Sequence, residues 1–129
     1  MKLVADTNIF LAVVLNEPER ARIIQLTANC QIIAPELLPY EIGNALSAML
    51  KRQQLTGKQI DLAFKRTQQI PVHLLKVNIE NALTVATENN IYAYDAYFLQ
   101  TALAYNCPLL TLDKKMKSVA TFLNIEVLE

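Results

Sequence analysis

Glycine, cysteine and histidine are scarce in this chain. Its 129 residues include two glycines, two cysteines and one histidine. Two glycines are too few for a phosphate-binding loop or a dinucleotide fingerprint. Cys30 and Cys107 stand alone, without the paired spacing of a zinc site or a disulfide framework. His73 has no partner of its kind for a triad or a zinc site. These absences exclude P-loop and Rossmann chemistry, and they give no support to a zinc site or to serine-hydrolase chemistry.

Long apolar runs and an excess of charge are missing too. The longest apolar run, Ile9 to Leu15, is far shorter than the roughly 18 residues that cross a bilayer. Asp6 interrupts the N-terminal run, so we expect no signal peptide. Net charge is zero, so binding to nucleic acid would need a local basic patch. With 53% apolar and 19% charged residues, we expect one globular domain over residues 1–129, located in the cytoplasm.

Short apolar runs alternate with stretches of helical periodicity. Five runs predict buried strands, at Lys2–Ala5, Gln31–Ala34, Val72–Val77, Leu109–Leu112 and Ile125–Leu128. Helices are expected at Thr7–Leu15, Pro18–Asn29, Pro39–Gln54, Thr56–Gln69, Asn78–Asn89, Asp95–Tyr105 and Lys114–Leu123. This alternation predicts an α/β fold, a three-layer sandwich in which helices cover both faces of a parallel sheet.

Four carboxylates sit where apolar segments give way to polar ones. Asp6 and Asp113 each follow a predicted strand, whereas Glu41 and Asp95 lie at the openings of predicted helices. In an open α/β sheet such junctions gather at the carboxyl ends of the strands. Each pair of acids at about 4 Å would cost on the order of 4 kcal/mol at an effective dielectric near 20. Because only a cation would offset that repulsion, the set predicts a site for a divalent metal in an open cleft.

Each acid also has an ordinary structural explanation. Asp6, Asp95 and Asp113 stand at helix starts, where aspartate is a favoured N-cap. Glu41 lies in a first turn, where a carboxylate complements the helix dipole. Capping explains any one of these residues, but it does not explain why all four junctions carry an acid.

Polar and basic side chains accompany the acids. Asn8 and Thr111 each lie two residues from an aspartate, and we expect them to orient the carboxylates or a bound water. Lys114, Lys115 and Lys117 follow Asp113, and the first two are candidates for contact with phosphate. A solvated helix face is the alternative use of these lysines.

Tyr92, Tyr94 and Tyr97 form an aromatic cluster at the start of the sixth predicted helix. Such rings can stack on nucleic-acid bases. Packing beside the helix start is the use that we expect from the sequence.

Together these blocks resemble a PIN domain, and more narrowly the VapC-type ribonuclease toxins of toxin–antitoxin pairs. The resemblance covers essentially the whole chain and rests on four segments: Val4–Phe10 (VADTNIF), Pro39–Leu46 (PYEIGNAL), Tyr94–Leu99 (YDAYFL) and Leu110–Asp113 (LTLD). The lysines after Asp113 depart from the family, in which arginine is frequent there. This departure concerns contact with the substrate and not the chemistry.

The resemblance implies a five-stranded parallel sheet with the acids clustered at its carboxyl edge around magnesium or manganese. By this likeness Asp6, Glu41, Asp95 and Asp113 match the family's acidic quartet. Asn8 and Thr111 match its supporting polar positions. It also implies a homodimer and a cognate antitoxin protein that binds beside the site.

The residue types themselves favour a hard cation. Carboxylates without histidine or thiolate select Mg²⁺ or Mn²⁺ over zinc. Such an ion acidifies water and polarises a phosphate. Asp6, Asp95 and Asp113 are the candidate ligands, and Glu41 either ligates through water or accepts its proton. Single-stranded RNA is the expected substrate, and attack by water would leave a 5′-phosphate and a 3′-hydroxyl.

Three alternatives remain, and the first two belong to other functional classes. A receiver-like signalling domain would need paired acids after the first strand, but only Asp6 is present there. A non-catalytic PIN module would bind RNA or protein without cleaving it. A housekeeping PIN nuclease would keep the chemistry and lack the antitoxin.

Overall fold

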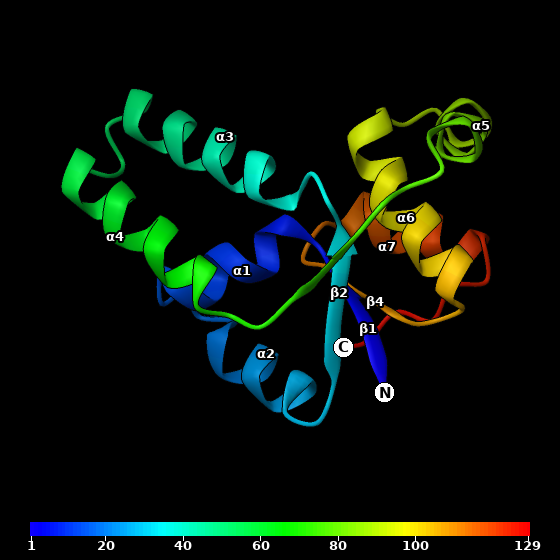
Figure 1. The fold of residues 1–129 in the computed structure, drawn as a ribbon, viewed down its shortest axis with the longest axis horizontal. Coiled ribbons are helices and arrows are strands. Elements are labelled where there is room, and N and C mark those ends of the chain that lie inside the picture. Colours follow the sequence, from blue (N-terminus) through cyan, green and yellow to red (C-terminus); the bar gives the residue numbers. More distant parts are fainter.

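Strands and helices alternate in the computed structural model, which describes residues 1–129 (Figure 1). The strands are β1 (Lys2–Ala5), β2 (Gln31–Pro35), β3 (His73–Leu75) and β4 (Leu109–Leu110). The helices are α1 (Thr7–Val14), α2 (Arg20–Thr27), α3 (Leu38–Lys51), α4 (Gly57–Gln68), α5 (Ile79–Asn89), α6 (Ala93–Tyr105) and α7 (Lys114–Phe122). Every predicted helix is present, with ends that differ by up to three residues.

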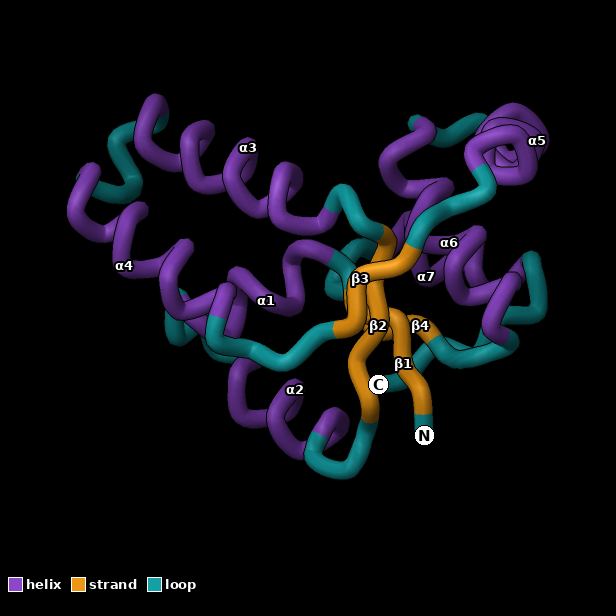
Figure 2. The backbone as a smooth tube through the Cα atoms, viewed as in Figure 1, coloured by secondary structure: helices purple, strands orange, loops and turns teal.

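The four strands form one parallel sheet in the order β3-β2-β1-β4. In the register, Leu3 pairs with Ile32, and Val4 pairs with Leu109 on the other side. Helices cover both faces, with α1 to α4 on one side and α5 to α7 on the other (Figures 1 and 2). The prediction of an α/β sandwich around a parallel sheet is therefore confirmed.

The prediction of five strands is wrong. Ile125–Leu128 contributes only an isolated bridge, in which Val127 pairs with Leu109. The reason is that β4 ends after two residues. On the edge of β4 that faces Ile125–Leu128, only Leu109 pairs: its N–H donates to the carbonyl oxygen of Glu126, and its carbonyl oxygen accepts from the N–H of Leu128, whereas Leu110 bonds to the β1 side. A neighbour of so short a strand has little edge to pair with.

The core lies between the sheet and its two helical layers. Its largest fully buried side chains include Phe98 of α6, Leu3 of β1, Ile33 of β2 and Leu38 of α3. The pair α3–α4, inserted between β2 and β3, extends away from the sheet as a helical hairpin (Figure 1). No helix combines the length and hydrophobicity that a bilayer-spanning segment requires.

Two helix starts decide where the acids lie. Helix α3 begins at Leu38, so Glu41 is in its first turn, as predicted. Helix α6 begins at Ala93, two residues earlier than predicted, because Tyr92 has extended backbone angles and occupies the N-cap position. Asp95 is therefore inside the first turn of α6 and is not its cap.

Candidate active site

Asp6 lies at the carboxyl end of β1, in the middle of the sheet, and is 7% exposed. Its Oδ1 accepts a hydrogen bond of 2.8 Å from the backbone N–H of Thr7, so it caps α1. Burial raises the pKa of Asp6 to about 6, and the charges of Asp95 and Asp113 add to the rise. The expectation of a carboxylate in an open cleft is wrong for this residue, because the start of α1 and the adjacent strand β4 enclose it.

Thr111 and Asn8 hold the other oxygen of Asp6. The Thr111 hydroxyl donates to Asp6 Oδ2 at 2.8 Å, and Asn8 Nδ2 donates to the same atom at 3.4 Å. Asn8 also accepts from the backbone N–H of Leu112 at 3.2 Å, which ties α1 to the segment after β4. Both side chains thus lie where the sequence placed them, as neighbours that orient an acid.

Glu41 faces Asp6 from the first turn of α3. The Thr7 hydroxyl donates to Glu41 Oε2 at 3.4 Å, whereas Glu41 Oε1 is buried and has no hydrogen-bond partner. Burial raises the pKa of Glu41, and the charges of Asp6 and Asp95 raise it further. Sequence reasoning overlooked Thr7, although it stands between Asp6 and Asn8 in the quoted N-terminal block.

Asp95 and Asp113 complete the cluster from α6 and α7. Asp113 is exposed and caps α7, since its Oδ1 accepts from the backbone N–H of Met116 at 3.1 Å. Asp95 is partly buried, and its pKa is raised by burial and by the charge of Asp113, while Lys115 lowers it. The structure therefore brings the four acids from four different elements into electrostatic contact.

The carboxylate oxygens of the four acids fit a hard divalent cation in their chemistry, although they do not yet surround one common position. No three acidic, histidine or cysteine side chains are arranged to enclose an ion. The buried Oε1 of Glu41 is a hard oxygen without a hydrogen-bond partner, so it is free to meet a cation or a water bound to one. Since uncompensated carboxylates repel one another, a cation would both satisfy this atom and draw the acids together.

The lysines after Asp113 divide into two groups. Lys114 and Lys115 are exposed at the start of α7, and Lys115 Nζ reaches the carbonyl oxygen of Asn90 at 3.4 Å. Lys117 instead pairs with Glu129 at 3.2 Å. Lys115 also lies close enough to Asp95 to lower the pKa of that carboxyl, whereas Lys117 is engaged elsewhere.

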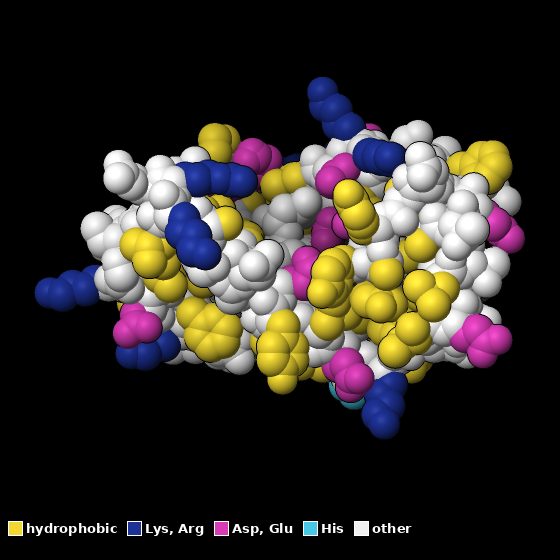
Figure 3. Space-filling view, turned by 90° about the horizontal axis from the view of Figure 1, so that it is seen from above, with side chains coloured by type: hydrophobic (Ala, Val, Ile, Leu, Met, Phe, Trp, Pro, Cys, Tyr) yellow, Lys and Arg dark blue, Asp and Glu magenta, His cyan; other side chains and the backbone are white.

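Two hollows adjoin this region. A pocket of about 420 Å³ lies between the first turns of α3 and α6, with Glu41 and Asp95 in its wall. Seen from above, acidic side chains occupy a central hollow, with hydrophobic side chains beside them (Figure 3).

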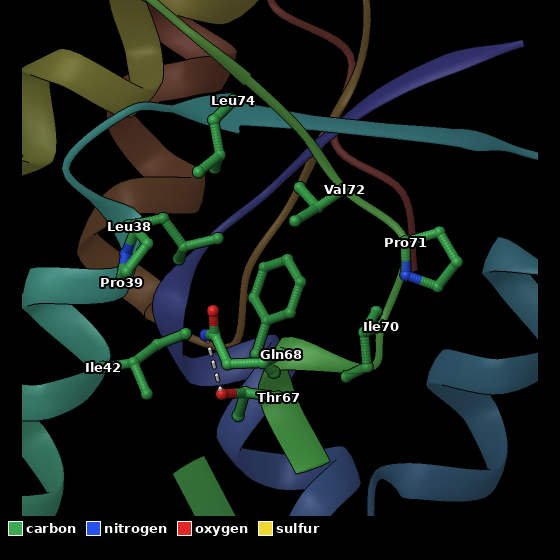
Figure 4. Close-up of a pocket in the computed structure, with 10 residues that line it drawn as sticks. Leu38, Pro39, Ile42, Thr67, Gln68, Ile70, Pro71, Val72 and Leu74 are labelled. Carbon is green, nitrogen blue, oxygen red and sulfur yellow. Dashed lines mark hydrogen bonds between the residues drawn. The ribbon is translucent and has the colours of Figure 1, made fainter. Parts of the chain in front are cut away.

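A second, apolar groove of about 290 Å³ lies between α3, the end of α4 and β3. Ile42, Val72 and Leu74 line this groove (Figure 4). Its polar members are Thr67 and Gln68, which are joined by a hydrogen bond of 3.4 Å. None of the four acids lines it.

The chain is thus an α/β domain that gathers four acids at the carboxyl edge of its parallel sheet. The family model of the PIN domain matches residues 3–121, and the chain therefore belongs to the PIN domain family. The comparison with curated protein sequences finds no match.

Solved structures share the architecture. PAE2754 from Pyrobaculum aerophilum superposes with a TM-score of 0.71 at 21% identity, covering 92% of this chain and 79% of that chain. VapBC2 from Rickettsia felis, bound to a promoter DNA fragment, superposes with a TM-score of 0.64 at 18% sequence identity, covering 99% of this chain and 98% of that chain. FitAcB from Neisseria gonorrhoeae superposes with a TM-score of 0.62 at 15% sequence identity, covering 98% of this chain and 96% of that chain. At these identities the likeness concerns the fold.

Proposed function

We propose that this protein is a metal-dependent endoribonuclease that hydrolyses phosphodiester bonds in single-stranded RNA. The observation that carries the proposal is the partner-free, buried Oε1 of Glu41 beside the buried carboxylate of Asp6. Buried acids with raised pKa values and no paired base are typical of functional sites. Membership of the PIN family agrees with this chemistry.

Asp6, Asp95 and Asp113 would hold Mg²⁺ or Mn²⁺. When bound, the ion would supply Lewis acidity toward the scissile phosphate and toward water. Thr111 and Asn8 fix the Asp6 carboxylate through Oδ2, so its orientation does not depend on the ion. Glu41, whose pKa burial raises, is suited to accept a proton from the attacking water. Lys114 and Lys115 would contact the substrate phosphates.

The test is cleavage of a labelled single-stranded RNA by the purified protein with Mg²⁺, and with the metal chelated. We expect cleavage only with the metal, and products that carry a 5′-phosphate and a 3′-hydroxyl. Asp6→Asn should abolish it. Cleavage that persists under chelation, or products with 2′,3′-cyclic ends, would refute attack by metal-activated water.

We further propose that the nuclease is the toxin of a toxin–antitoxin pair. The structural neighbours include toxin–antitoxin complexes, VapBC2 and FitAcB. The apolar groove between α3, α4 and β3 would receive a helix or extended tail of the antitoxin. An arginine of that antitoxin would bind the acids bidentately and compete with the metal.

Expression of the chain alone should arrest growth, and coexpression with a small upstream neighbour should yield an inactive complex. A harmless protein that stays active beside its neighbour would point to a housekeeping PIN nuclease. A protein that binds RNA and never cleaves it would point to a non-catalytic module.

A homodimer is the proposed assembly. The α3–α4 hairpin extends from the body and exposes apolar side chains, among them Leu50 and Leu62. A two-fold interface involving this hairpin would cover them and open both acidic sites to a shared groove. A clean monomer in light scattering at high micromolar concentration would contradict this assembly.

A further inference from the structure

Three tyrosine side chains stand exposed around the pocket between α3 and α6. Tyr40 is 82% exposed, Tyr92 is 83% exposed and Tyr94 is 63% exposed. All three line the same pocket of about 420 Å³ as Glu41 and Asp95. The rings therefore stand beside two of the four carboxylates, and Figure 3 shows hydrophobic side chains next to acidic ones at the central hollow.

Packing does not account for these rings. Tyr94 meets Tyr97 edge to face, with centroids 6.1 Å apart, so the packing predicted from the sequence applies to that pair. It is wrong for Tyr92, which is almost fully exposed. Tyr92 also occupies the N-cap position of α6 without a side-chain hydrogen bond, although Ser, Thr, Asp or Asn would stabilise the helix there. A local rule broken without a packing gain is typical of a functional position.

The electrostatics of the site determine what such rings can bind. The chain has no net charge, and the cluster itself is acidic, so long-range attraction of a phosphate backbone is weak. Beyond the contacts of Lys114 and Lys115, affinity must then come from contacts that do not depend on charge. Stacking of unpaired bases on tyrosine rings is such a contact, and it accepts any base because every base has a π-face.

We propose that Tyr40, Tyr92 and Tyr94 bind single-stranded RNA by stacking with unpaired bases on both sides of the scissile phosphate. The inference rests on the proposed nuclease function, because the acids in the same pocket fix where that phosphate lies. Tyr40 comes from α3, Tyr94 from the first turn of α6 and Tyr92 from the N-cap before it, so the rings come from the two helix starts that line the pocket. A duplex is rejected, since its base faces are covered by their neighbours.

The test is fluorescence anisotropy with a short labelled single-stranded RNA and Mg²⁺, in an Asp6→Asn background that prevents cleavage. Tyr→Ala at each of the three positions should weaken binding about tenfold, whereas Tyr→Phe should retain it. Phe122→Ala is the matched control, because Phe122 is 78% exposed at the far end of α7 and lies outside the pocket. A duplex of the same sequence should bind weakly, and its affinity should be the same in the alanine variants.

Four outcomes are separable when the tyrosine variants are also assayed for cleavage with Asp6 intact. Loss of binding in the alanine variants alone supports stacking. Alanine variants that bind and cleave like the parent overturn stacking, while the nuclease function stands. Tyrosine-dependent binding in a protein that cleaves no RNA supports stacking by the rings but overturns the nuclease function and, with it, the placement of the rings around a scissile phosphate. Alanine variants with unchanged RNA affinity that lose a dimer or an antitoxin overturn stacking and mark the rings as protein contacts.

Discussion

Replacing Asp6 with asparagine should make the metal-free protein more stable at neutral and alkaline pH. Burial raises the pKa of Asp6 from 3.8 to about 6, so ionisation in the folded state is unfavourable. The folded chain holds the proton more tightly than the unfolded chain, and stability is therefore lost as pH rises from about 4 to about 6. Above that window the loss is about 3 kcal/mol.

Asparagine removes this penalty but gives up part of the hydrogen bonding. Its oxygen can still accept from the backbone N–H of Thr7, whereas its amide would donate to the Thr111 hydroxyl, which reverses that bond, and could no longer accept from Asn8 Nδ2. The altered hydrogen bonding costs about 1 kcal/mol, so the net gain in the free energy of unfolding is about 2 kcal/mol. For a domain of this length, that gain raises Tm by about 7 °C.

The assay is thermal unfolding in a chelator at pH 8 and at pH 4, with Asp61→Asn as the control because Asp61 is exposed on α4. The advantage of Asp6→Asn should disappear at pH 4, where the Asp6 carboxyl is protonated in the folded state. Excess Mg²⁺ at one hundred times its Kd should stabilise the parent by about 3 kcal/mol and the variant far less, reversing their order. A variant whose Tm at pH 8 is equal to or below that of the parent would refute the reasoning.

Three further perturbations separate structural from chemical roles. Asp113→Ser should keep the cap of α7 but lose cleavage, while Asp113→Ala should also lose about 1 kcal/mol of unfolding free energy in a denaturant titration. Thr7→Val removes a hydrogen bond that lowers the pKa of Glu41, so the acid limb of the pH–rate profile should move to higher pH. If that limb does not move, Glu41 is not the base. Lys114→Ala combined with Lys115→Ala should raise KM several-fold with kcat nearly unchanged in steady-state kinetics, and an unchanged KM would place both lysines outside the substrate path.

Signals carried by neighbouring residues made most of the fold predictable. Thr56 and Gln59 form the predicted capping box, in which each side chain accepts from the other residue's backbone N–H. Asn78 caps α5 by accepting from the backbone N–H of Asn81 at 2.9 Å. Such contacts span three residues, so the sequence alone contains all of their geometry.

Features that depend on distant partners were not predictable. Ile125–Leu128 forms only a bridge because β4 is two residues long and Leu109 alone pairs with that segment, and the length of β4 depends on how it packs beside β1. The burial of Asp6 likewise depends on β4 closing beside β1. The acids could be foreseen as a set, because parallel strands bring their carboxyl ends to one edge, but their degree of burial could not.

The α3–α4 hairpin links the openness of the acidic site to the exposure of the tyrosines. Because the hairpin leaves the sheet after β2, no helix fills the space between the first turns of α3 and α6. Glu41 and Asp95 thereby face a pocket, and Tyr40 and Tyr92 lose the neighbours that would bury them. From the sequence alone, an aromatic residue at a helix start is expected to pack against a neighbouring element. The sequence does not show that no such element covers these rings. The exposure of the rings is thus a consequence of topology, and it places apolar surface beside carboxylates that would otherwise repel the RNA backbone.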